Sequence, residues 1–221
     1  MMQIKDAFFE LFDGNRLAVG TEDGGCLRLS DAKYDWVNYV YMHLDLGQEH
    51  AIGVYPLVCR NQENWWVKWG SVDFDEGEEV SFAHAQRVLA LLKKFDITAW
   101  VERSRSKGYH VWVFCSEWVP AWVMRRSLLV VTSAVGAPIK EINPKSEGFD
   151  NPKTLGNYVR LPYPGWLDPL NVVSPTRRVV LDKGGIEMML EEFVHAAMAS
   201  RCRPEQLERL ASFWVPPKPI V

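Results

Sequence analysis

The residues best suited to chemistry are two aspartates, Asp73 and Asp75, in the segment Val-Asp-Phe-Asp at positions 72–75. In a β-strand, side chains two residues apart project from the same face, so these carboxylates would point together while their apolar neighbours pack inward. Hard divalent cations prefer such oxygen ligands. The pair therefore predicts a metal site, and an edge strand running into the acidic turn 76–79 is the ordinary alternative.

A second chemical feature is the loop Ser-Arg-Ser-Lys-Gly at positions 104–108, which leads through Tyr109 into His110. Backbone amides, hydroxyls and cationic side chains in a loop of this kind can bind phosphate oxygens. His110 opens an apolar strand and shares a face with Trp112. A single histidine in that place is often only structural, and this alternative stays open.

Helices and strands must position these residues. Apolar periodicity and capping residues predict helices over residues 4–12, 30–43, 81–95 and 120–135, and one or two more after Gly184. Branched and aromatic runs predict short strands before residue 29 and strands over 52–58, 65–74, 97–102, 109–114, 139–142 and 157–161. This order of elements predicts a mixed α/β or α+β domain.

Composition sets limits on the class of protein. With 221 residues, 48% hydrophobic and 24% charged, the chain is long enough for one sizeable globular domain. Its longest apolar run, near 128–131, is too short to span a bilayer, and no leader pattern opens the sequence. We therefore expect a soluble, cytoplasmic protein with no membrane partner.

Net charge and cysteine content bear on nucleic-acid binding, zinc binding and disulfide bonds. The formal net charge of -3 argues against tight nucleic-acid binding through many phosphate contacts. The four cysteines are scattered along the chain, so neither a zinc site nor a disulfide framework is predicted. They are Cys26, Cys59, Cys115 and Cys202.

Ordered blocks along the chain carry a resemblance to a known family. They are 11–16 (Leu-Phe-Asp-Gly-Asn-Arg), 43–44 with 53–57, the two aspartates in 72–75, 101–114, 141–145 (Glu-Ile-Asn-Pro-Lys) and 156–162 (Gly-Asn-Tyr-Val-Arg-Leu-Pro). Together they resemble the archaeo-eukaryotic primase superfamily, in particular its primase-polymerase branch related to the primase domain of TOTE conflict systems. The resemblance covers about residues 8–165.

The resemblance implies roles for residues that their spacing alone does not assign. Asp73, Asp75 and Glu141 would be the catalytic acids and would bind two Mg²⁺ or Mn²⁺ ions. Glu141 departs from the pattern, because many relatives carry aspartate there. The implied nucleotide-binding residues are His110, Ser104, Ser106, Lys107, Arg160, Lys145 and Asn157.

The resemblance also implies an activity. It is that of a DNA primase-polymerase, which makes or extends primers from nucleoside triphosphates on a single-stranded DNA template during replication. The expected partner is a replicative helicase, and the expected setting is the cytoplasm of a bacterium or a phage-infected host. The implied fold is a catalytic core with an RRM-like sheet and flanking helices over 1–182, followed by a helical extension over 183–221.

Two other classes of function stay open. One is a non-catalytic primase-like module that binds nucleotides or DNA in a replication complex, although a retired site would be expected to have lost an acid. The other is a two-metal nuclease or a nicking initiator. An initiator needs a His-hydrophobic-His pair, and His110 is the only histidine in its segment.

Overall fold

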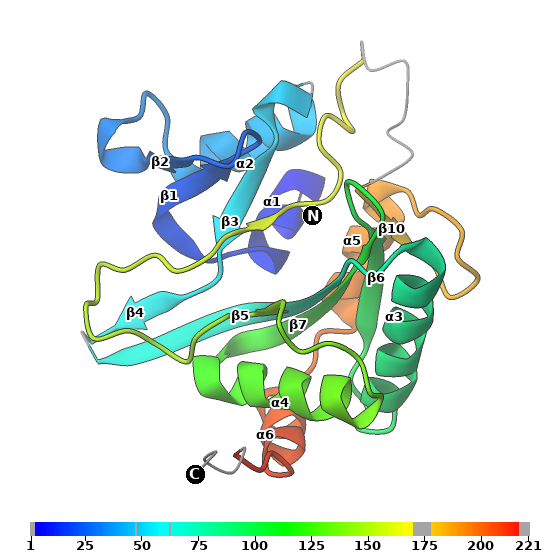
Figure 1. The fold of residues 1–221 in the computed structure, drawn as a ribbon. Helices are drawn as coiled ribbons and strands as arrows, with labels where there is room; N and C mark the ends of the chain where they lie inside the picture. The colour runs from blue at the N-terminus through cyan, green and yellow to red at the C-terminus, as the bar shows by residue number, and fades with distance from the viewer. Residues whose placement is uncertain (1–2, 47, 62, 170–177, 217–221) are drawn as a thin grey trace.

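The structure is a computed structural model that describes residues 3–46, 48–61, 63–169 and 178–216. Within these residues, two antiparallel sheets and six α-helices build a mixed α+β fold, which confirms the predicted fold class. The smaller sheet lies above the larger one in the view of Figure 1. No helix within the described ranges is long and apolar enough to cross a membrane.

The smaller sheet has the strand order β2-β1-β3-β9. Its strands are β1 (Asn15–Thr21), β2 (Cys26–Arg28), β3 (Ile52–Tyr55) and β9 (Val159–Arg160). The larger sheet has the order β10-β6-β7-β5-β4, and β8 pairs with β5 as well. Its strands are β4 (Val58–Arg60), β5 (Asn64–Phe74), β6 (Ala99–Arg103), β7 (Tyr109–Pro120), β8 (Ile142–Asn143) and β10 (Val179–Leu181).

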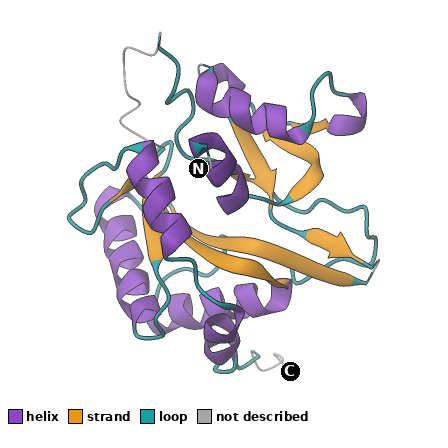
Figure 2. Cartoon of the chain, turned by 180° about the vertical axis from the view of Figure 1, so that it is seen from behind, coloured by secondary structure: helices purple, strands orange, loops and turns teal. Residues whose placement is uncertain are grey.

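Helices cover both faces of the larger sheet. They are α1 (Ile4–Leu11), α2 (Trp36–Asp45), α3 (Glu78–Lys93), α4 (Ala121–Ala134), α5 (Leu190–Ala199) and α6 (Pro204–Ala211), with 3-10 turns at Leu29–Asp31 and Gln48–His50. α3 and α4 pack on one face, and α1 and α5 pack together on the other, which Figure 2 shows from behind. The alternation along β5 explains this: Gly70 faces α4, whereas the Trp69 ring contacts Phe12 next to α1.

The centre of the core is aromatic. Phe12 meets Trp112 and Phe114 edge to face, with ring centroids 5.1 Å apart in both pairs. Burying side chains of this size stabilises a fold by about 1.5–3 kcal/mol each. Phe193 of α5 belongs to the same core, as does Leu207 of α6. The division into a domain over 1–182 and an extension over 183–221 stays a prediction, and 217–221 lie outside the described residues.

Several predicted boundaries were wrong. The helix predicted from Ser30 begins at Trp36, because the Asp35 carboxylate caps it by accepting a hydrogen bond from the Asn38 amide at 2.9 Å. The helix predicted from Ser81 begins at Glu78. The Ser81 hydroxyl instead accepts a hydrogen bond from the Glu76 amide at 3.0 Å.

The predicted strands also differ in detail. The strand expected over 52–58 is split into β3 and β4 around Pro56, a residue without an amide donor for a sheet. The strand expected over 139–142 lies later, at Ile142–Asn143. β7 is longer than expected and ends at Pro120. α4 begins at the next residue, Ala121, one position after the predicted start.

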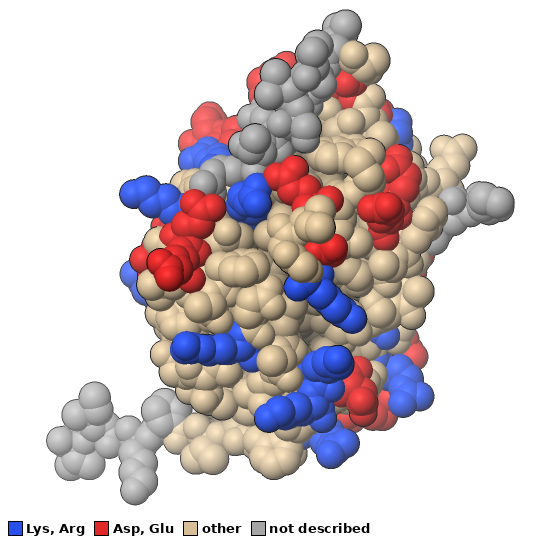
Figure 3. Space-filling model, turned by 90° about the vertical axis from the view of Figure 1, so that its right-hand side faces the viewer, with Lys and Arg blue, Asp and Glu red and all other residues tan. Residues whose placement is uncertain are grey.

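Charged side chains are separated on the side of the molecule that α3 covers. α3 carries Glu78 and Glu79 in its first turn and Lys93 in its last turn. Figure 3 shows acidic side chains mainly over the upper part of this side and basic side chains mainly over the lower part. On this side of the molecule, side chains of opposite charge therefore occupy different regions.

Candidate active site

Antiparallel pairing sets acids and a histidine in one row across the larger sheet. Asp73 of β5 is opposite His110 of β7, and His110 is opposite Glu102 of β6. Side chains directly opposite each other project from the same face. On the other side of β5, the Asp73 amide donates to the Glu141 carbonyl at 2.9 Å. The strand register thus brings three distant parts of the sequence to one place.

The row borders a cavity of about 220 Å³ that is lined by residues of both sheets. Most of the predicted site residues line it, namely Asp73, Asp75, Ser104, Ser106, His110, Glu141, Lys145, Asn157 and Arg160. Lys107 is exposed and lies outside this lining. The polar lining residues that the sequence did not predict are Glu102, Arg105, Asn143, Tyr158 and Arg178.

His110 lies between two carboxylates. Its Nδ1 donates to Glu102 Oε2 at 2.9 Å, and its Nε2 is 3.6 Å from Asp73 Oδ2. Burial alone would lower the pKa of His110, but the charges of both acids and the hydrogen bonds to them raise that pKa to about 10. The imidazole is therefore cationic at neutral pH and faces the cavity with a positive charge.

Glu102 is the main residue of this row that the sequence prediction missed. It is 1% exposed, and the same Oε2 accepts a second hydrogen bond from Trp112 Nε1 at 2.7 Å. A hairpin centred on Ser106 pairs position 102 with position 110, as the register shows. Positions 102 and 110 are each four residues from the centre of the hairpin. This equal spacing in the sequence identifies Glu102 as the neighbour of His110.

The acids are chemically suited to divalent cations, although they are not gathered around a common point. Asp73 is partly buried, and burial raises the pKa of its carboxyl, but the His110 hydrogen bond and the charges of His110 and Lys145 lower it overall. Glu141 Oε2 lies 2.5 Å from Lys145 Nζ, and Asp75 is exposed. Among the described residues, no three His, Cys, Asp or Glu side chains form a ready metal cluster.

The loop 104–108 approaches the end of β5 very closely. The Ser104 amide donates to the Gly108 carbonyl at 3.0 Å, which closes the loop. A Cβ atom at Gly108 would lie 2.1 Å from the Phe74 carbonyl oxygen and 3.3 Å from the Asp75 Cα. Only glycine permits this approach, and it places the hydroxyls of the loop beside the paired aspartates.

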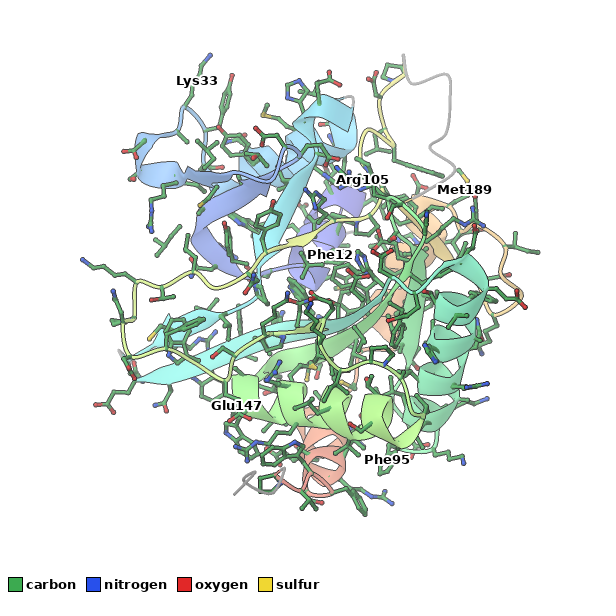
Figure 4. The ribbon with its side chains drawn as sticks, in the orientation of Figure 1. Phe12, Lys33, Phe95, Arg105, Glu147 and Met189 are labelled. Carbon is green, nitrogen blue, oxygen red and sulfur yellow. The ribbon has the colours of Figure 1, made fainter. Side chains whose placement is uncertain are left out.

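Arginines also line the cavity. Arg105 projects from the β6–β7 loop toward the smaller sheet (Figure 4), and Arg160 comes from β9. Arg178, directly before β10, is 4% exposed and donates from Nη2 to the Leu161 carbonyl at 3.0 Å. Burial lowers the pKa of Arg178 in spite of acids nearby. No family block reached Arg178, so the sequence prediction missed it.

Comparisons with known proteins show what this chain is similar to. The family model that matches is described as the TOTE conflict system, Archaeo-Eukaryotic Primase domain, and it covers residues 14–166. No curated protein matches the chain. The solved polymerase domain from Mycobacterium tuberculosis Ligase D in complex with DNA is 15% identical, with a TM-score of 0.44 over 96% of this chain and 91% of that chain. The family match includes all the polar cavity residues named above except Arg178.

Proposed function

Because the chain belongs to the archaeo-eukaryotic primase domain family of TOTE conflict systems, we propose that it makes or extends strands from nucleoside triphosphates on a single-stranded DNA template. The family supports a nucleotidyltransferase of the primase-polymerase type. One observation carries the finer proposal. A single cavity is lined by both carboxylates and cationic groups, the two kinds of side chain that binding of a metal–triphosphate pair requires.

Asp73, Asp75 and Glu141 are the residues that would hold Mg²⁺ or Mn²⁺. Three carboxylates around one cavity suit hard cations, and such ions, when bound, activate the attacking hydroxyl and stabilise the leaving pyrophosphate. Glu141 would have to exchange its partner Lys145 for the metal. Lys145 would then be free to bind a phosphate oxygen.

The cationic groups would bind the triphosphate. His110 is held in one orientation by Glu102 and supplies a fixed positive charge. Ser104, Ser106, Arg160 and Asn157 line the same cavity and would donate hydrogen bonds to phosphate oxygens. Lys107 lies outside the lining and stays a candidate from the sequence alone.

A second candidate is a non-catalytic module that binds nucleotides. The observation that favours it is the dispersed state of the acids, since Glu141 is paired with Lys145 and Asp73 with His110. A binding module would keep its affinity for nucleotides but would form no phosphodiester bond. A helicase partner and a role in replication are further expectations that follow from the family.

Strand synthesis tests the proposal directly. The protein is incubated with a labelled single-stranded template, nucleoside triphosphates and Mg²⁺ or Mn²⁺, with and without a primer. We expect products longer than the primer from the wild type and none from the double variant Asp73→Ala/Asp75→Ala. The control Glu205→Ala/Glu208→Ala removes two exposed acids of α6 and should retain full synthesis.

The outcomes separate the candidate functions. Synthesis by the double aspartate variant would overturn the assignment of these acids to the metal. Nucleotide binding by the wild type without any product would favour the binding module. Shortening of the template would instead indicate a nuclease. Circular dichroism of each variant establishes that the fold is retained.

A further inference from the structure

Glu22, in the turn between β1 and β2, is the meeting point of several arginines. Its Oε1 lies 3.0 Å from Arg105 Nη1, and its Oε2 lies 2.9 Å from Arg178 Nη1. Arg160 approaches the same oxygen with Nε at 3.8 Å and donates from Nη2 to the Glu22 carbonyl at 3.1 Å. Among the described residues, Glu22 therefore contacts the guanidinium groups of all three arginines that line the cavity.

These contacts join the two sheets across the cavity. Glu22 and Arg160 belong to the smaller sheet, whose β1 and β9 both pair with β3. Arg105 and Arg178 belong to the larger sheet, where they adjoin β6 and β10. A nitrogen of each arginine lies within 3.8 Å of a Glu22 carboxylate oxygen.

Charge explains why such a carboxylate is needed. Three guanidinium groups repel one another, and Arg178 is almost fully buried, so that its charge requires a partner. Glu22 compensates one positive charge and leaves a net positive surface toward the cavity. Each guanidinium has five N–H donors, and the contacts with Glu22 use only some of them. Arg160 Nε is buried and has no hydrogen-bond partner among the residues that the structure describes.

We infer that Glu22 is a positioning residue that holds Arg105, Arg160 and Arg178 together as a clamp for the polyphosphate tail of a nucleotide. The inference rests on the proposed function and names a residue that neither the family blocks nor the cavity lining includes. The contribution of Glu22 should be largest for Arg105, because its side chain is 58% exposed and its ion pair with Glu22 keeps it at the cavity. Without the carboxylate, repulsion would turn Arg105 into solvent, and nucleotide binding would have to order it again.

Glu22 could instead be an anion that competes with the nucleotide. The two roles predict changes of opposite sign in nucleotide affinity when the carboxylate is removed. A positioning residue strengthens nucleotide binding, so its removal weakens binding. A competing carboxylate occupies donors that phosphate needs, so its removal tightens binding. The sign of the change in nucleotide affinity on Glu22→Gln therefore decides between them.

Equilibrium dialysis with radiolabelled dATP and Mg²⁺ measures this affinity without requiring catalysis. We expect roughly tenfold weaker binding for Glu22→Gln, the scale of one charge-assisted hydrogen bond. If the wild type synthesises strands, KM should rise by the same factor while kcat changes by less than about twofold. The matched control is Asp23→Asn, in the same turn, because the Asp23 carboxylate bonds only Thr21 and Gly25 among the described residues.

A double-mutant cycle with Arg105→Gln tests the link between the residues. If Glu22 acts through Arg105, the double variant should bind dATP more tightly than the sum of the two single effects predicts. Should Glu22→Gln fail to fold, Arg105→Gln carries the test, since its exposed side chain can be replaced without cost to the core, and the same weakening is expected.

Each remaining outcome contradicts the inference. Unchanged or tighter dATP binding by Glu22→Gln would show that the carboxylate does not position the clamp. In that case nucleotide binding and synthesis by the wild type would still support the proposed function. Failure of the wild type to bind any nucleotide would overturn both.

Discussion

His110 donates a hydrogen bond from Nδ1 to Oε2 of Glu102, 2.9 Å away on the neighbouring strand. The carboxylate is buried, and Trp112 donates to the same oxygen. Because Nδ1 is occupied, the ring cannot rotate freely, and Nε2 is directed toward Asp73. Glu102 thus fixes both the orientation and the positive charge of the histidine that we place beside the triphosphate.

Replacing Glu102 by glutamine should affect both stability and nucleotide binding. The amide keeps an acceptor oxygen but loses the negative charge that the buried His110 cation requires. We expect the free energy of unfolding to fall by about 1–3 kcal/mol, as for other buried charged hydrogen bonds that lose a partner. Urea denaturation measures this change, and nucleotide titration should show weaker binding.

A matched control is Glu187→Gln. Glu187 Oε1 pairs at 2.7 Å with Nη1 of Arg103, the residue after Glu102 on β6, but the Glu187 side chain is 38% exposed. Exposed ion pairs contribute about 0–1 kcal/mol, so this variant should be nearly as stable as the wild type. Equal losses of stability in the two variants would contradict the special role of the Glu102–His110 pair.

The variant His110→Gln should separate nucleotide binding from template binding. The change removes a cation from the cavity but leaves the arginines in place. We expect the nucleotide concentration for half-maximal synthesis to rise by roughly tenfold or more, while the affinity for single-stranded DNA, measured by fluorescence anisotropy, changes little. A large loss of DNA affinity with an unchanged nucleotide response would assign His110 to the template instead.

Local patterns in the sequence predicted much of the larger sheet. The alternation around Asp73 and the turn composition of 104–108 are properties of a few neighbouring residues, so the strands β5 and β7 were expected correctly. The start of α2 was not, because both Ser30 and Asp35 are good capping residues and local sequence does not choose between them. The contribution of each site residue to activity stays a prediction.

The parts of the cavity that local patterns missed depend on long-range packing. Glu22 and Arg178 are separated by 156 positions, yet they form a charged hydrogen bond at 2.9 Å. No periodicity or spacing connects such residues, because only the arrangement of the two sheets brings them together. Family resemblance supplied Arg160 and Glu141. Without it, Arg160 would be taken for a solvated strand residue and Glu141 for a surface carboxylate beside Lys140.

Glu141→Gln should abolish synthesis without weakening the fold. Glu141 is paired with Lys145 in a partly exposed position, and such pairs contribute about 0–1 kcal/mol. As a proposed metal ligand, however, its charge would be required, so strand synthesis should fall by roughly a hundredfold or more. Synthesis is compared with that of Glu147→Gln, which removes a carboxylate paired with Arg126 outside the cavity lining. Full synthesis by Glu141→Gln would exclude it as the third acid.

The burial of His43 should make the stability of the fold depend on pH. It is fully buried, its Nε2 lies 2.7 Å from the Pro162 carbonyl, and its Nδ1 accepts a hydrogen bond from the Ile52 amide at 3.2 Å. This is the neutral tautomer, since Nδ1 cannot accept a hydrogen bond when it is protonated. Burial, and then the charge of Arg178, lower the pKa of His43 to about 3.

An unfolded histidine has a pKa near 6.5, so between about pH 6.5 and pH 3 the unfolded chain binds a proton that the folded chain excludes. His43 therefore destabilises the fold as pH falls through this window, by about 1.4 kcal/mol per pH unit, and has no effect above it. Urea unfolding at about pH 7, 6 and 5 measures the slope. His43→Gln should show a smaller loss of stability between pH 6 and 5 than the wild type, whereas His195→Gln, at an exposed position of α5, should follow the wild type. Parallel slopes for wild type and His43→Gln would mean that another group is responsible for the acid sensitivity.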